Sequence, residues 1–268
     1  MRSKGGIELV YVEHEPAEVR RAIESGICTF LVDRECRGKE RRQSGRDTEI
    51  APASLDELRT VAGIPGARAW CRINSFGDET EREIESAIDA GAVCIFLPMV
   101  TSVADTERFL ALLGGRCEAA ILVETCAAVR LSPELGRLPL DRVYLGLNDL
   151  AIDRGAGSIF DAVGDGTVER VRRHFPRAAF GFAVLTDTRR GDPIPAHLLT
   201  REIHRLDCSF SFCRRSFRRD TRGRDMAVVV AEIETFFRAL GRRSAEKCAR
   251  DHADLLASIE RESRRLCS

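Results

Sequence analysis

Eight short apolar runs alternate along this chain with segments of helical periodicity, and this alternation leaves few folds open. Each run is nearly continuous in apolar residues, which is typical of strands that are buried on both faces of a parallel sheet. Eight such strands alternating with helices predict a closed (β/α)8 TIM barrel. The predicted strands cover residues 7–12, 28–32, 69–73, 93–99, 119–123, 142–147, 179–184 and 208–213.

Amphipathic segments between the runs predict the helices of this barrel. The segment after the fifth run is the weakest helix, because Pro133 and Gly136 interrupt it. An open, doubly wound sheet is the alternative fold, but no clear Gly-x-Gly-x-x-Gly motif follows the first run. The predicted helices cover residues 16–25, 54–62, 78–90, 102–113, 158–173, 195–205 and 225–240. Capping pairs mark three of their starts: Ser54 with Glu57, Asp78 with Glu81, and Ser102 with Asp105.

The barrel accounts for residues 1–240, and residues 241–268 form a C-terminal extension. We predict one additional helix over residues 244–266, where a few apolar side chains form a narrow stripe on a charged background. This stripe can dock either on its own barrel or on a neighbouring subunit, and the second placement predicts a homo-oligomer. The stripe consists of Leu255, Leu256, Ile259 and Leu266.

Charge and hydropathy exclude several classes of partner. The 42 Lys and Arg residues balance 42 Asp and Glu residues, so no overall field attracts nucleic acid or a membrane surface. No apolar run approaches the roughly 18 residues that a membrane helix needs. The first residues also lack the apolar core of a signal peptide, and we therefore expect a cytoplasmic protein.

Cysteine and lysine usage restricts the chemistry further. The ten cysteines show no C-x-x-C or Cys/His metal spacing, so we expect unpaired thiols, several of them small buried hydrophobes. The few lysines lie outside the apolar runs, whereas a Schiff-base lysine needs a desolvated site, so imine chemistry is disfavoured. The cysteines expected to be buried are Cys28, Cys71, Cys94 and Cys208.

Polar residues at the carboxyl ends of the runs are candidates for a site, because this is where barrels of this kind carry their chemistry. Glu124 follows the fifth run and Asp149 the sixth, so the two carboxylates are expected side by side on one rim. Oxygen ligands suit Mg²⁺ or Mn²⁺, which leave positions open for a chelating substrate. The alternative is that each carboxylate merely begins a loop or caps a helix. The other polar residues at these ends are His14, Asp33, Glu35, Asn74 and Asn148.

Arg72 lies inside an otherwise apolar run, where an unpaired guanidinium is costly to bury. Its partner can be Glu35 from the neighbouring strand, or the carboxylate and oxo group of a substrate, which a guanidinium binds as a fork. The two alternatives are compatible if Glu35 orients Arg72. We therefore name Arg72 and Glu35 as the catalytic candidates.

At these residues the sequence resembles the HpcH/HpaI aldolase and citrate lyase β-subunit family, whose members are metal-dependent (β/α)8 barrels acting on C–C bonds. The likeness spans roughly residues 7–240, and the motifs are fairly specific in combination and order. The matching segments are 32–39 with Arg42-Gln43 and Asp47-Thr48, then 71–74, Gly91 with 96–99, 122–125 and 146–150.

The resemblance implies roles for individual residues. Glu124 and Asp149 would hold a divalent metal, Mg²⁺ or Mn²⁺, and Arg72 would contact a 2-oxo acid. Backbone N–H groups around Asn148 and Asp149 would bind the carboxylate of that acid. In such aldolases the metal chelates pyruvate and stabilises its enolate, which adds to an aldehyde or forms by the reverse cleavage. The resemblance thus predicts an aldolase acting on a 2-oxo acid and an aldehyde.

Departures from the family pattern keep two other functions open. Many of these aldolases have a histidine after the glutamate of the second strand, whereas this chain has Cys36. The alternatives are an acyl-CoA C–C lyase or thioester hydrolase of the citrate lyase type, and a barrel without catalysis that serves as a binding partner. The absence of a lysine after Pro98 favours the pyruvate aldolases over the acyl-CoA enzymes.

An arginine-rich segment follows the eighth run. It can bind a phosphate, a carboxylated sugar or the phosphates of coenzyme A, or its arginines can pair with acidic neighbours. Nucleic-acid binding is disfavoured because no aromatic residues are interleaved in a basic domain. The cluster consists of Arg214, Arg215, Arg218, Arg219, Arg222 and Arg224.

Overall fold

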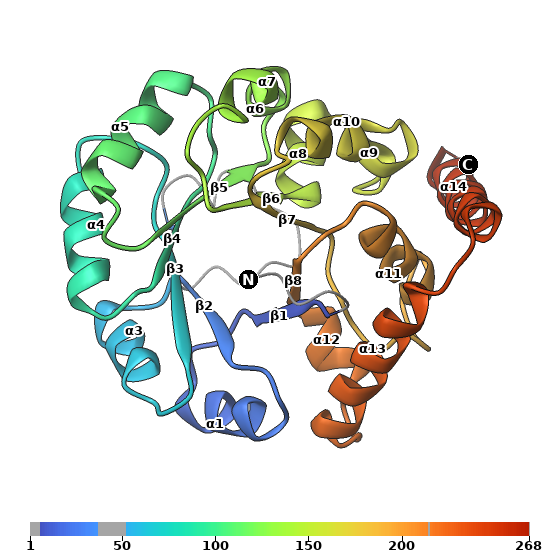
Figure 1. Ribbon diagram of the computed structural model, residues 1–268, viewed down its shortest axis with the longest axis horizontal. Helices are drawn as coiled ribbons and strands as arrows, with labels where there is room; N and C mark the ends of the chain where they lie inside the picture. The colour runs from blue at the N-terminus through green and yellow to red at the C-terminus, as the bar shows by residue number, and fades with distance from the viewer. Residues whose placement is uncertain (1–5, 37–51, 214, 268) are drawn as a thin grey trace.

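The computed structural model describes residues 6–36, 52–213 and 215–267 of the chain. Within these residues eight parallel strands form a single sheet in the order β7-β6-β5-β4-β3-β2-β1-β8, surrounded by helices (Figure 1). Each predicted run forms a strand close to its expected position. The strands are β1 (Glu8–Tyr11), β2 (Thr29–Asp33), β3 (Arg68–Arg72), β4 (Cys94–Leu97), β5 (Glu118–Val123), β6 (Arg142–Leu145), β7 (Ala179–Phe182) and β8 (Phe210–Cys213).

Backbone hydrogen bonds join the two ends of this sheet. The N–H of Ser209 donates to the carbonyl of Phe180 at 2.9 Å, and the N–H of Leu185 donates to that of Phe212 at 3.0 Å. A parallel bridge also pairs Val184 with Phe212 just beyond β7. These contacts bring β7 beside β8, so the sheet curls into a nearly closed barrel and the predicted (β/α)8 fold is confirmed.

The helices lie outside the barrel, as Figure 1 shows. The predicted helix over 158–173 is divided in two, because Gly166 adopts φ +73°, a left-handed conformation that a helix interior does not allow. The helices after β6 and β8, α8 and α12, were not predicted. The helices are α1 (Pro16–Glu24), α3 (Leu55–Ala62), α4 (Thr80–Asp89), α5 (Val103–Leu113), α6 (Cys126–Arg130), α7 (Ser132–Leu135), α8 (Leu147–Arg154), α9 (Asp161–Gly164), α10 (Thr167–His174), α11 (Ala196–Arg205), α12 (Arg215–Asp220), α13 (Met226–Leu240) and α14 (Ala245–Cys267).

Two of the three predicted capping residues cap their helices. Ser54 and Glu57 form the complete capping box at the start of α3, and the hydroxyl of Ser102 accepts the N–H of Asp105 at the start of α5. The prediction for Asp78 is wrong. A turn in which the N–H of Thr80 donates to the carbonyl of Gly77 precedes α4, so the helix begins at Thr80 and Asp78 lies within the turn.

Aromatic and aliphatic side chains fill the interior of the barrel. Trp70 is fully buried there, with its ring centre 5.5 Å from that of Phe96 and 5.7 Å from that of Phe210. At the amino ends of the strands, the guanidinium of Arg142 stacks 4.3 Å from the Trp70 ring. Arg142 also pairs with Glu118 at 2.6 Å and with Glu8 at 2.8 Å, which satisfies its charge. The side chain of Arg142 is therefore packed and paired at this end of the barrel.

The C-terminal helix α14 packs on α11 and α9 of its own chain, as Figure 1 shows at the right of the view. Leu255 and Ile259 of the predicted stripe are buried in this contact. Asp251 is buried as well, and it pairs with Arg243 at 2.9 Å and with Lys247 at 2.9 Å. Leu255 and Ile259 thus pack on this chain's own barrel, whereas Leu266 of the same stripe is 51% exposed. The homo-oligomer remains a prediction.

Three of the four cysteines that were predicted to be buried are buried. Cys71, Cys94 and Cys208 are buried, and burial raises the pKa of each thiol. Cys28 is exposed, because it precedes β2 instead of forming part of it. Among the described residues, no helix combines the length and apolar character needed to cross a membrane.

Replacing Trp70 with alanine tests the packing of the barrel interior. We expect Trp70→Ala to lower the free energy of unfolding by about 3–5 kcal/mol, because the change leaves a cavity among buried rings. Denaturant unfolding measures this loss. The control is Val228→Ala on α13, where the side chain is 48% exposed. Equal stabilities of the two variants would contradict the proposed packing.

Candidate active site at the carboxyl ends of the strands

A cavity of about 250 Å³ opens at the carboxyl ends of the strands. Its walls come from β3, β5, β6 and the segments that follow β7 and β8. Four of the five predicted site residues line it, namely Arg72, Glu124, Asn148 and Asp149. The fifth, Glu35, is not part of the lining but contacts Arg72. The structure thus gathers all five residues at one end of the barrel.

Arg72 is the last residue of β3 and is 5% exposed. Its Nε and Nη2 atoms donate to the two carboxylate oxygens of Asp33, at 2.8 and 2.5 Å. Its Nη1 lies 3.4 Å from Oε2 of Glu35. Burial acts to lower the pKa of this guanidinium, but Asp33 and Glu35 together raise it well above its usual value. Arg72 therefore remains charged.

Asp33 is a site residue to which the sequence prediction gave no role. It ends β2 and pairs directly with Arg72 in the register of the parallel strands, so the two side chains leave the same face of the sheet. Glu35 lies two residues further on, beyond the end of the strand, and makes the longer contact. The strand register, which the sequence does not show, selects Asp33 as the closer partner.

Glu124 follows β5 and is 2% exposed. Its Oε1 accepts the backbone N–H of Met99 at 3.0 Å, and Met99 has φ +52°, a left-handed conformation for a residue with a side chain. Gly146 leaves the space that the carboxylate occupies, since a Cβ at this position would lie 2.6 Å from Oε2 of Glu124. Two neighbouring strand ends thus fix the orientation of Glu124.

The pKa of the Glu124 carboxyl is raised to about 8. Burial is the largest cause, and the negative charge of Asp149 adds to it, whereas Arg72 acts in the opposite direction. A carboxyl in this state takes up a proton readily, and a nearby cation would displace that proton.

Asp149 lies in the first turn of α8 and is 9% exposed. Its Oδ1 atom is fully buried and has no hydrogen-bond partner among the described residues. A buried carboxylate oxygen without a partner is costly and points to a ligand. Asn148 precedes it, and the first N–H groups of a helix have no acceptors within the helix, so the start of α8 offers donors to an anion.

The carboxyls of Glu124 and Asp149 together suit a divalent cation. They supply two hard oxygen donor groups. In the described part of the chain, no group of three or more His, Cys, Asp or Glu residues could hold a metal ion, so a cation here would have the two carboxylates as its acidic ligands. Mg²⁺ is commonly held by one or two carboxylates and completes its coordination with water and substrate oxygens. The donor set therefore fits Mg²⁺ or Mn²⁺ better than Zn²⁺.

Two other strand-end residues make contacts outside the cavity. The exposed Cys36, at the position of the family histidine, donates its backbone N–H to the amide oxygen of Asn74 at 2.9 Å. His14 lies 3.5 Å from Glu57. Neither residue lines the cavity. The resemblance over residues 37–48 lies outside the described residues.

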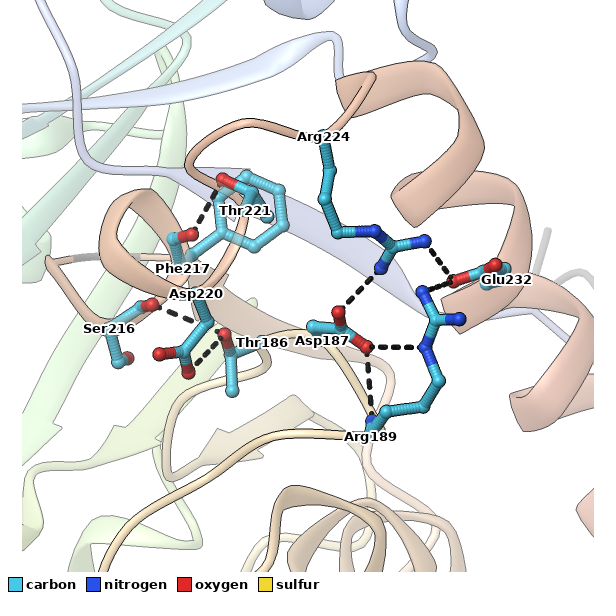
Figure 2. A network of polar contacts seen from close by, with 9 residues as sticks. All are labelled: Thr186, Asp187, Arg189, Ser216, Phe217, Asp220, Thr221, Arg224 and Glu232. Atoms are coloured by element: carbon cyan, nitrogen blue, oxygen red, sulfur yellow. Dashed lines mark hydrogen bonds and ion pairs between the residues drawn. The ribbon is translucent and has the colours of Figure 1, made fainter.

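Three arginines of the segment after β8 pair with acidic neighbours in the part that the structure describes. Arg218 contacts Glu13, and Arg219 contacts Asp220. Figure 2 shows that Arg224 contacts both Asp187 and Glu232. Arg214 lies outside the described residues, as does the side chain of Arg215. Of the cluster, Arg219 lines the cavity.

These features define a barrel with an acidic site at its open end, and comparisons with known proteins place the fold. No family model matches the chain. Over 120 residues the chain is 24% identical to pyruvate kinase from Encephalitozoon cuniculi (strain GB-M1), and this match covers 45% of the chain and 27% of that protein.

Solved structures match over nearly the whole chain. An HpcH/HpaI aldolase/citrate lyase family protein from Burkholderia cenocepacia J2315 has a TM-score of 0.61 at 12% identity, with 89% of this chain and 96% of that chain covered. The protein CitE from Mycobacterium tuberculosis, in complex with magnesium and pyruvate, has a TM-score of 0.57 at 16% identity, with 94% and 98% covered. Macrophomate synthase has a TM-score of 0.57 at 12% identity, with 87% and 86% covered. The chain therefore shares the fold of structures from the family that its strand-end motifs resemble.

The raised pKa of Glu124 predicts a pH-dependent effect of replacing it. In the presence of a chelator, the folded protein holds this proton up to about pH 8, whereas the unfolded chain releases it near pH 4.5. The contribution of Glu124 to stability therefore falls as the pH rises through this window. We expect Glu124→Gln to melt at a higher temperature than the wild type at about pH 9, with a smaller advantage at about pH 5. A difference that does not change with pH would contradict the assignment.

Gly146 provides a second test of the site. We expect Gly146→Ala to lower the free energy of unfolding by about 1–3 kcal/mol, because the added methyl group overlaps the buried Glu124 carboxylate. The matched control is Gly157→Ala, where an added Cβ meets nothing within 4 Å. Chemical denaturation of both variants measures the difference, and equal losses would show that Gly146 is not needed to accommodate Glu124.

Proposed function

We propose that this protein is a divalent-metal-dependent C–C lyase, an aldolase that forms or cleaves an aldol bond through the enolate of a pyruvate-type 2-oxo acid. The observation that carries the proposal is the pair of buried carboxylates, Glu124 and Asp149, in one cavity with the buried guanidinium of Arg72. This combination offers a site for a cation and a site for an anion side by side.

The comparisons support the same chemistry. The Mycobacterium tuberculosis structure was solved with magnesium and pyruvate, and the Burkholderia structure carries the name of an aldolase and citrate lyase family. The match to a pyruvate kinase, although partial, also names pyruvate.

Glu124 and Asp149 would hold the cation, with the unpartnered Oδ1 of Asp149 as one donor. When bound, Mg²⁺ or Mn²⁺ supplies Lewis-acid stabilisation of the negative charge that develops on the 2-oxo oxygen. The cation would also balance the charge of two acidic side chains that are otherwise buried close together.

Arg72 would bind the 2-oxo acid. Two of its five N–H donors are used by Asp33, and the remaining donors are available to Glu35 and to a substrate oxygen. Asp33 and Glu35 orient the guanidinium, so that it meets the substrate without having to reorganise. The first-turn N–H groups at Asn148 and Asp149 would bind the substrate carboxylate.

Exchange of the methyl protons of pyruvate tests this function without an aldehyde. In D₂O with Mg²⁺ or Mn²⁺, we expect the wild-type protein to catalyse the replacement of these protons by deuterium, followed by proton NMR, and a chelator to stop it. Glu124→Gln and Asp149→Asn should each slow the exchange by about a hundredfold or more, because each removes a ligand of the stabilising cation.

The control for this experiment is Asp56→Asn on α3, which removes a carboxylate whose side chain is 91% exposed. It should exchange at the wild-type rate. Wild-type exchange that does not depend on metal, or that survives both site substitutions, would overturn the proposal.

A further inference from the structure

The cavity that contains Glu124 and Asp149 extends to the far side of the barrel. Its lining also includes Thr186, in the segment after β7, and Ser216 and Asp220 of α12, which follows β8. In the strand order, β7 is four positions away from β3, the strand that carries Arg72. A molecule held at the carboxylate pair therefore faces a second wall built by β7 and β8.

This second wall carries one polar spot, formed by Thr186, Arg219 and Asp220. The hydroxyl of Thr186 donates to Oδ2 of Asp220 at 2.9 Å, and Nε of Arg219 donates to its Oδ1 at 2.8 Å. The side chain of Asp220 is 7% exposed. Each carboxylate oxygen can accept a further hydrogen bond, so Asp220 retains capacity for a ligand donor.

Ion pairs and hydrogen bonds of the next residue, Asp187, hold this polar spot in place. Figure 2 shows Thr186 directed towards Asp220, while the neighbouring Asp187 points towards two arginines. Asp187 is 2% exposed; it pairs with Arg224 at 2.5 Å and accepts the N–H of Arg189 at 3.0 Å. Glu232 of α13 pairs with both arginines, so the segment after β7 is tied to the outer helix. Thr186 is therefore a fixed feature of the cavity wall.

The rest of the lining is largely apolar. Aliphatic and aromatic side chains stand in the wall alongside the carboxylate pair and the polar spot, so the part of a ligand that they contact should be apolar. They include Leu147, Ile159, Phe160, Val184, Ile194 and Leu199.

The charges of the polar spot restrict the distal end of the ligand. Arg219 and Asp220 neutralise each other, and Asp192 also lines the cavity. A ligand carboxylate would meet two acidic side chains and only one arginine, so it is disfavoured, and an ammonium group would compete with Arg219 for Asp220. A hydroxyl group can donate to Asp220 without disturbing this balance.

From these observations we infer the class of the second substrate: a neutral aldehyde with an apolar body, aromatic or branched alkyl, and a hydroxyl group at its far end. This inference rests on the proposed aldolase function. In the addition, the methyl carbon of the 2-oxo acid loses a proton and bonds to the aldehyde carbon, and the aldehyde oxygen gains a proton. No oxidant or additional reactant is required.

The test compares three aromatic aldehydes with pyruvate and Mn²⁺: 4-(hydroxymethyl)benzaldehyde, whose hydroxyl group stays neutral, benzaldehyde and 4-carboxybenzaldehyde. We expect kcat/KM to be about tenfold higher for the hydroxylated aldehyde than for benzaldehyde, and lowest for the carboxylated one. Asp220→Asn should reduce the preference for the hydroxyl group to about twofold or less, because the charged acceptor is lost. Thr186→Val, which removes only a hydroxyl, should reduce this preference in the same direction.

Thermal melting of each variant shows whether it is folded, and Asp56→Asn should keep the wild-type ratio of the three aldehydes. A wild-type preference for the carboxylated aldehyde, or a hydroxyl preference that survives in both folded variants, would overturn the inference. If pyruvate exchanges its protons but none of the three aldehydes reacts, the inference fails and the proposed function stands. If the wild-type protein exchanges no pyruvate protons, both fail.

Discussion

The burial of several carboxylates around one guanidinium is the constraint on which the open end of this barrel depends. Asp33 and Glu35 are held by Arg72, whereas Glu124 and Asp149 remain close together with little to balance them. Two like charges in a dry site cannot both be ionised without a compensating cation. Burial, and then the charge of Asp149, raise the pKa of Glu124, and an oxygen of Asp149 has no partner among the described residues. A site built in this way favours either a proton or a metal ion.

The buried carboxylates and the interactions that stabilise the barrel lie at opposite ends of the strands. At the amino ends of the strands, Arg142 pairs with two glutamates and stacks on Trp70, so its positive charge is balanced by residues of the barrel itself. At the carboxyl ends, Arg72 and the carboxylate pair retain unused donors and acceptors. Substitutions that alter ligand binding at the carboxyl ends can therefore leave the packed interior intact. In barrels of this kind, the active site commonly lies at the carboxyl ends and stabilising contacts at the amino ends.

The motifs that carry the predicted resemblance cover one side of the cavity and leave out the other. Arg72 ends β3, Glu124 follows β5 and Asp149 lies in α8 after β6, in segments where the sequence resembles the aldolase and citrate lyase family. The wall on β7 and β8 is built by Thr186, Asp220 and the network around Asp187, which no motif of the resemblance covers. Loops on a constant scaffold commonly set the choice of substrate in this way.

The sequence by itself determined the order and approximate limits of the eight strands, because strands buried on both faces are continuously apolar and need no distant partner to be recognised. It also placed Glu124 and Asp149 on one rim, since the carboxyl ends of parallel strands meet at the same end of a barrel. Only the tertiary structure decided that Asp33 is the closer partner of Arg72, because strand register sets which side chains are adjacent. The tertiary structure likewise decided two further contacts. Gly146 leaves space for Glu124, and Thr186 forms a hydrogen bond with Asp220. These contacts join residues that are far apart in the chain, and their geometry depends on backbone positions that no local pattern encodes.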